Sequence, residues 1–211
     1  MQNVRGMDRE ALTDVTFKFL AVVTLSYFAV EVIREWLKDP SRVTLLLLTV
    51  SACVSVSLSI VSTRPVVRNT SPLAVLLTLA ATFYYPALIL TPGRHIIPEL
   101  AGAAMQVIGT GFEIYAKFSL GKSFGMLPAR RTVVIRGAYR LVRHPMYLGY
   151  FIHFMGFLLA NFGVQNLVIY AGLYMILILR IFLEEGSLKK VDQTYQLYCD
   201  TVKYRVIPFV F

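Results

Sequence analysis

The sequence contains few charged residues and few of the residues that build metal or redox sites. Asp, Glu, Lys and Arg together make up 16% of the 211 residues, well below the roughly 25% of a typical soluble domain. The two cysteines, Cys53 and Cys199, are far apart and only three histidines occur, so neither a disulfide framework nor a metal or haem site is predicted. No strand–GxGxxG–helix pattern is present, which excludes a dinucleotide-binding fold.

Long apolar segments dominate the chain instead. Hydrophobic residues make up 56% of the sequence. They form runs of about twenty residues, the length that crosses a hydrocarbon layer of about 30 Å. We therefore predict an all-α, polytopic transmembrane helical bundle with five or six spans. The six candidate spans are residues 17–36, 43–62, 73–90, 97–118, 146–162 and 164–183.

The segments between the candidate spans are too short to hold a soluble domain, so residues 1–211 are expected to form a single membrane domain. The first span is long enough to remain in the membrane, and we interpret it as a retained helix rather than a cleaved signal peptide. After the last span, apolar residues such as Leu188, Tyr195 and Tyr198 recur at helical spacing. This pattern predicts an amphipathic helix at the membrane surface or packed under the bundle.

The formal net charge is +9, and the basic residues concentrate in the fourth connection between spans. This connection carries Lys117, Lys122, Arg130, Arg131, Arg136, Arg140 and Arg143. Basic loops of membrane proteins lie in the cytoplasm against anionic lipid. We therefore expect both termini and this loop on the cytoplasmic side, in the inner membrane if the source is prokaryotic. Membrane lipids, not nucleic acid, are the expected partners of this charge, and the sequence does not indicate an oligomeric state.

Ionisable residues inside apolar segments are costly and need an explanation. Glu113 and Lys117 are four residues apart in the favourable order, and we interpret them as a structural pair. Arg180 and Glu184 share one helix face, next to Glu185. Two carboxylates at a helix C-terminus oppose the helix dipole, so they require a partner, either a helix-end salt bridge or a bound cation or amine.

The stretch RGAYRLVRHPMYLGYF, residues 136–151, places three arginines, a histidine and a proline directly before an apolar run. Pro145 is typical of the first position of a helix. His144, just before it, is suited to contact a ligand near that helix N-terminus. The alternative is an interfacial histidine that bonds only to the backbone.

Taken together, GAYRLVRHPMYLGY, a helical hairpin, RIFLEE and a tail with Y-x2-Y that ends in V-I-P resemble the isoprenylcysteine carboxyl methyltransferase family. That family is similar to the membrane phospholipid methyltransferases. The resemblance covers residues 120–208 and implies a methyltransferase core there, with a cofactor-binding loop, a helical hairpin and a C-terminal helix. Residues 1–119 match only as generic transmembrane helices.

The resemblance implies a transfer of methyl from S-adenosylmethionine, giving S-adenosylhomocysteine, in a pocket that faces the cytoplasm and is closed by the loop and the C-terminal helix. Arg180 would face the methyl acceptor. The segment 131–134 departs from the expected residue types, so it would act through its backbone. The implied cofactor-binding residues are Arg131, Thr132, Val133, Val134, Tyr139, His144, Pro145, Met146, Tyr147 and Glu184.

These residue types suit that chemistry. Glu184 or Glu185 can pair with the ammonium of the cofactor, and Arg131 or Arg143 with its carboxylate, while tyrosine rings face a cation or the adenine. A carboxylate acceptor is ionised at neutral pH and needs only a cation such as Arg180 to orient it, whereas an amine acceptor needs a base. We therefore predict isoprenylcysteine-like O-methylation of a lipophilic carboxylate that enters from the bilayer. The alternatives are a phospholipid or small-molecule N-methyltransferase and a non-catalytic membrane scaffold.

Overall fold

The computed structural model describes residues 2–61, 72–120, 134–191 and 193–211. The described residues form seven α-helices and no strand, which confirms the all-α prediction. Two short 3-10 turns, η1 (Tyr85–Ala87) and η3 (Gly137–Arg140), lie between helices. The helices are α1 (Gln2–Lys38), α2 (Val43–Val61), α3 (Pro72–Thr82), α4 (Glu99–Leu120), α5 (Pro145–Ala160), α6 (Val164–Val191) and α7 (Gln193–Thr201).

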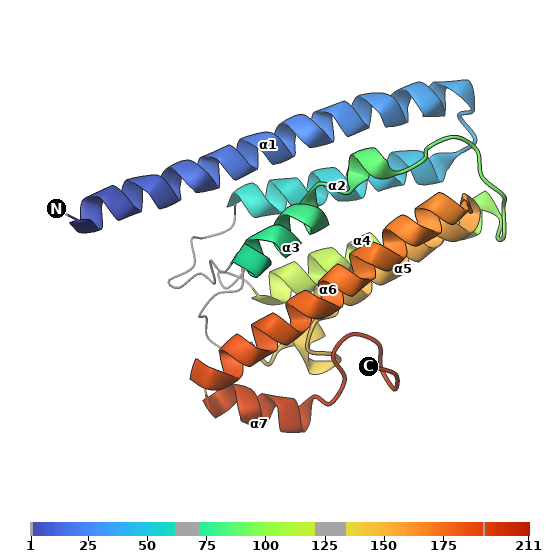
Figure 1. Ribbon diagram of the computed structural model, residues 1–211. Helices are drawn as coiled ribbons and strands as arrows, with labels where there is room; N and C mark the ends of the chain where they lie inside the picture. Colours follow the sequence, from blue (N-terminus) through green and yellow to red (C-terminus); the bar gives the residue numbers. More distant parts are fainter. Residues whose placement is uncertain (1, 62–71, 121–133, 192) are drawn as a thin grey trace.

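Most helices run roughly alongside one another, and α7 lies across the end of α6 (Figure 1). By length and composition, Val164–Lys189 is the one stretch among the described residues that could cross a membrane as a helix. Two further apolar helical stretches, Val43–Val54 and Pro145–Ala160, are shorter. Five or six spans therefore remain a prediction.

The predicted span 73–90 is wrong as a single helix. Helix α3 ends at Thr82, and its 11 residues cover about 16 Å at 1.5 Å per residue. The chain continues into η1, where Pro86 occupies an early helical position. Proline has no backbone N–H and clashes with the preceding turn of an α-helix, so the helix cannot continue through this residue.

Helices α4 and α5 pack antiparallel and at close range because glycines face each other across the contact. A Cβ atom on Gly109 would lie 2.5 Å from the His153 backbone nitrogen, and one on Gly149 would lie 2.8 Å from the Glu113 backbone nitrogen. Small residues allow helix backbones to approach in this way in membrane proteins. The close approach places Glu113 directly against the first turns of α5.

A buried polar cluster fixes the other end of this helix pair. The Arg42 guanidinium donates to Asn161 Oδ1 at 2.7 and 3.3 Å, and the Asn161 amide donates to Thr44 Oγ1 at 2.8 Å. The backbone N–H and hydroxyl of Thr44 donate to Glu99 Oε1 at 2.7 and 2.6 Å. The cluster ties the turn between α1 and α2 to the start of α4 and the end of α5.

Candidate functional site

Four segments meet at the end of the bundle opposite the Arg42 cluster. They are the end of α4, the turn η3 with the start of α5, the end of α6, and α7 with the tail that follows it. In Figure 1 the yellow segment that contains η3 lies between α6 and α7, beside the tail. The predicted site residues on η3, α5 and α6 are thus brought together by the fold.

A glycine turn leads the chain from the basic loop into η3. Gly137 has a φ of +60°, a conformation that glycine adopts without steric cost. The neighbouring Ala138 N–H donates to Ser119 Oγ at 3.2 Å, and Arg136 Nε donates to the Ser119 carbonyl at 3.3 Å. The last turn of α4 therefore sets the position of η3.

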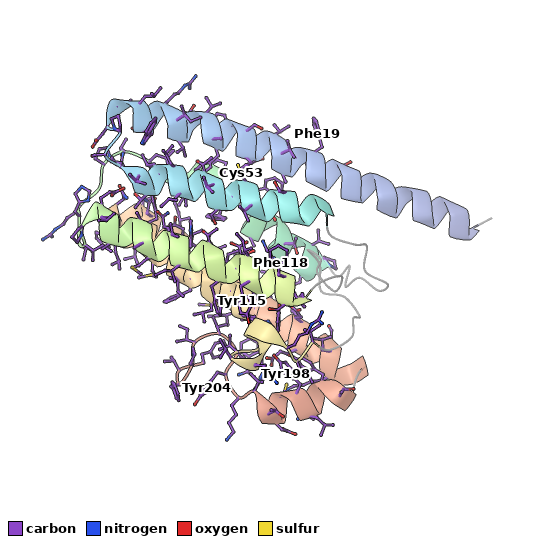
Figure 2. The ribbon with its side chains drawn as sticks, turned by 180° about the vertical axis from the view of Figure 1, so that it is seen from behind. Phe19, Cys53, Tyr115, Phe118, Tyr198 and Tyr204 are labelled. Atoms are coloured by element: carbon purple, nitrogen blue, oxygen red, sulfur yellow. The ribbon has the colours of Figure 1, made fainter. Side chains whose placement is uncertain are left out.

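Tyr139 is buried within η3, and its carbonyl is held by α7. The Tyr198 hydroxyl donates to this carbonyl at 2.7 Å. Figure 2 shows Tyr198 on α7, next to η3. Burial raises the pKa of Tyr198, so its hydroxyl remains a donor throughout the neutral pH range. The predicted amphipathic helix is thus present and packs under the site through Tyr195, Tyr198, Cys199 and Val202.

Helix α5 begins as predicted, with Pro145 in its first turn and His144 at its N-cap. The His144 side chain makes no capping bond. Its ring lies parallel to the Tyr147 ring, with the centroids 5.7 Å apart and the planes at 8°. The His144 backbone N–H donates to the Arg205 carbonyl at 2.7 Å, so the tail holds this residue in place.

The buried carboxylate of Glu185 is the centre of a charged cluster. Its Oε1 accepts from Arg143 Nη1 at 3.1 Å and lies 3.4 Å from His144 Nε2, and its Oε2 accepts from Arg205 Nε at 3.1 Å. The other Arg143 nitrogens donate to the carbonyls of Val202 and Lys203 at 2.7 and 2.8 Å. All three Arg143 nitrogens therefore bond to protein.

Arg180 and Glu184 lie on α6 beside the start of α5. Both are partly buried, and the charges of both act on the Tyr147 phenol. Among the described residues, Glu184 forms no ion pair. The two adjacent carboxylates thus have different environments, because Glu185 is paired with Arg143 and Arg205 inside the protein while the charge of Glu184 acts on the Tyr147 phenol.

Comparison with known families agrees with this arrangement. The family model for phospholipid methyltransferases matches residues 98–194. These residues form a phospholipid methyltransferase domain. The family includes the isoprenylcysteine carboxyl methyltransferases, so the resemblance noted from the sequence is confirmed. No curated protein matches the chain. The match supports a membrane methyltransferase domain at residues 98–194 and leaves its methyl acceptor open.

The predicted site residues all lie within the matched segment 98–194, and most of them lie close together in the structure. Those at the junction of η3, α5 and α6 are Tyr139, His144, Pro145, Met146, Tyr147, Arg180 and Glu184. Val134 is partly buried and precedes η3. Arg131, Thr132 and Val133 lie outside the described residues. None of these positions has been shown to bind a ligand, so their roles remain predictions.

Sequence reasoning missed the residues that hold the site together from a distance. Ser119 and Arg205 carry no motif of their own, and their partners are Ala138 and Glu185. The sequence feature that pointed to Arg205 was the pair of basic residues, Lys203 and Arg205, in KYRVIP. Such residues can pair with a buried carboxylate as well as with lipid headgroups. The suggestion that Arg143 binds the cofactor carboxylate is weakened, because its nitrogens are already used.

Proposed function

We propose that the chain is an S-adenosylmethionine-dependent methyltransferase that methylates the carboxylate of a lipophilic acceptor. The observation that carries the proposal is the position of Arg180 and Glu184 beside Tyr147, separate from the Glu185 cluster. One cation and one anion thus lie near the Tyr147 phenol. A cationic cofactor and an anionic acceptor are complementary to such a pair of charges.

The residues present fit the proposed cofactor. S-adenosylmethionine carries an ammonium group, a carboxylate and an adenine, and when bound it supplies an electrophilic methyl group on a sulfonium. Glu184 would hold the ammonium, and the parallel rings of His144 and Tyr147 offer a face for the adenine or the sulfonium. The positive end of the α5 dipole would favour the cofactor carboxylate.

Arg180 would orient the acceptor. A carboxylate is ionised at neutral pH, so the protein need not remove a proton from it, and most of the catalysis would be positioning of the two reactants. The apolar surface of α6 supports entry of a lipophilic acceptor from the bilayer. The site would face the cytoplasm, since the most basic connection of the sequence, which carries Arg136, Arg140 and Arg143, lies at this end of the helices.

Cofactor binding tests the site. The purified protein in detergent should bind S-adenosylmethionine by calorimetry, and His144→Ala and Glu184→Gln should each weaken binding by about tenfold or more, the loss expected for a charge-assisted contact. Glu31→Gln is the matched control, because Glu31 pairs with Arg34 on α1. Unchanged affinity in both site variants would overturn the assignment, and no binding by the wild type would favour a scaffold.

The chemistry of the product tests the acceptor. With methyl-labelled cofactor and N-acetyl-S-farnesylcysteine, we expect a base-labile ester, and Arg180→Gln should abolish its formation while cofactor binding persists. The family name makes phosphatidylethanolamine the proper competitor. A base-stable label on that lipid, without ester formation, would replace the carboxylate proposal with N-methylation.

A further inference from the structure

A buried ion pair lies on α4, away from the cofactor residues already described. Lys117 Nζ bonds to Glu113 Oε1, and the two side chains are 4% and 0% exposed. A buried ion pair loses the hydration of both charges, and well-packed apolar residues often serve stability equally well. The stability of α4 alone therefore does not explain why this ion pair is buried, and we looked for a role in ligand binding.

The pair points toward the start of α5. Gly149 packs against the backbone of Glu113, and Lys117 Nζ lies 6.0 Å from the centre of the Tyr150 ring. The Tyr150 ring is in turn 6.1 Å from the Tyr147 ring, which stacks on His144. A continuous series of side chains thus leads from the ion pair to the proposed cofactor site.

Arg180 reaches the same tyrosines from α6. The charges of Glu113 and Arg180 both act on Tyr150, and Arg180 also acts on Tyr147. Two cations on different helices, Lys117 on α4 and Arg180 on α6, therefore lie near the Tyr150 ring. Because Lys117 is buried, only a ligand that enters the bundle can contact it, and a lipophilic acceptor is such a ligand.

We propose that Lys117, held in place by Glu113, is a second acceptor-binding cation and contacts the acceptor carboxylate together with Arg180. This inference rests on the proposed function. Lys117 and Arg180 can each donate a hydrogen bond to a carboxylate but cannot accept one from a protonated amine, so the two side chains would select carboxylates. The transfer forms an O–CH3 bond on the acceptor and breaks the S–CH3 bond of the donor, and it leaves a neutral ester and a neutral thioether. The loss of the negative charge weakens the attraction to both cations and aids release of the ester.

The test removes both charges of the pair, so that no buried charge is left alone. In Glu113→Gln/Lys117→Met we expect the KM for N-acetyl-S-farnesylcysteine to rise about tenfold, as for loss of one charge-assisted contact, with unchanged affinity for S-adenosylmethionine. Glu31→Gln/Arg34→Met removes an exposed ion pair from α1, makes the same change in charge and should leave both values unchanged. If the Met variant does not fold, Glu113→Gln/Lys117→Gln carries the same expectation and keeps two polar side chains.

An unchanged acceptor KM in a folded double variant, with an active wild type, would overturn the role of Lys117. If the wild type forms no ester at all, the proposed function fails. The role of Lys117 is then tested separately, by comparing how strongly the free acid and its methyl ester bind to the protein. The wild type should be stabilised against heat more by the free acid than by its methyl ester, and the double variant, which retains Arg180, should show a smaller preference. Equal stabilisation of the wild type by acid and ester would also overturn the inference.

Discussion

Glu185 in the C-terminal part of α6 accepts a hydrogen bond of 3.1 Å from Arg143, the residue that precedes the N-cap of α5. The same carboxylate accepts a bond of 3.1 Å from Arg205 in the tail. A single buried acid thus joins three segments that are far apart in the sequence. The prediction that Glu184 and Glu185 end the helix was wrong, because α6 continues to Val191. The arrangement accounts for Glu185 by its ion pairs and leaves Glu184 as the carboxylate proposed to bind a ligand.

Glu185→Gln should therefore destabilise the protein. Removal of one partner from a buried ion pair costs about 3–5 kcal/mol, because Arg143 and Arg205 would lose their counter-ion. Thermal unfolding in detergent should show a clearly lowered midpoint. Glu184→Gln is the control at the adjacent position and should leave the midpoint nearly unchanged while it weakens cofactor binding. Equal midpoints for the two variants would contradict the division of roles.

Gly137→Ala should disturb η3 and, with it, cofactor binding. A left-handed backbone costs a non-glycine residue about 1–2 kcal/mol, and the added Cβ would lie 2.2 Å from Ser119 Oγ. Ser119 would have to rotate and would lose the N–H of Ala138. We expect lower thermal stability and weaker binding of S-adenosylmethionine by calorimetry.

Gly111→Ala on α4 is the control for that substitution. A Cβ at Gly111 meets nothing within 4 Å, and alanine is favoured over glycine inside a helix by about 1 kcal/mol. This variant should be as stable as the wild type or more so, with unchanged cofactor affinity. A Gly137→Ala variant that behaves like Gly111→Ala would show that the turn does not position the site.

The sequence predicted the elements of this site better than their contacts. Pro145 correctly predicted the first turn of α5, and the long apolar run after residue 163 correctly predicted helix α6. Successive helical residues differ by about 100° in direction, so Glu184 and Glu185 face different surroundings. Local sequence does not reveal which of them faces Arg143, 42 residues away, because tertiary packing decides it. The same reason explains why Tyr198 was not expected to hold Tyr139.

Asn161→Leu should weaken the fold and leave the site intact. Arg42 is 3% exposed and would lose both bonds to Asn161, at a cost of about 3 kcal/mol for a hydrogen bond to a buried charge. The cluster lies at the opposite end of α4 and α5 from His144. We therefore expect a lowered unfolding midpoint with unchanged affinity for S-adenosylmethionine.

Gln165→Leu at the start of α6 is the control for Asn161→Leu. Gln165 is exposed, and its amide donates only a long bond of 3.4 Å to the Ala87 carbonyl, so its loss should change the midpoint little. If Asn161→Leu weakened cofactor binding in proportion to its loss of stability, the two ends of the bundle would be coupled and this expectation would be wrong.

Tyr198→Phe should loosen η3 without removing any charge. The variant leaves the buried Tyr139 carbonyl without its 2.7 Å hydrogen bond, which should cost about 1–2 kcal/mol and weaken cofactor binding because Tyr139 is no longer held. Burial raises the pKa of Tyr198 above its ordinary value. The bond therefore contributes fully below about pH 10 and is lost only as the pH rises through the raised pKa. The difference in unfolding midpoint between the variant and the wild type should accordingly be the same at about pH 6 and about pH 8. Tyr204→Phe, which alters a partly buried ring in the tail, should have a smaller effect, and an equal effect would mean that the hydroxyl of Tyr198 does not position η3.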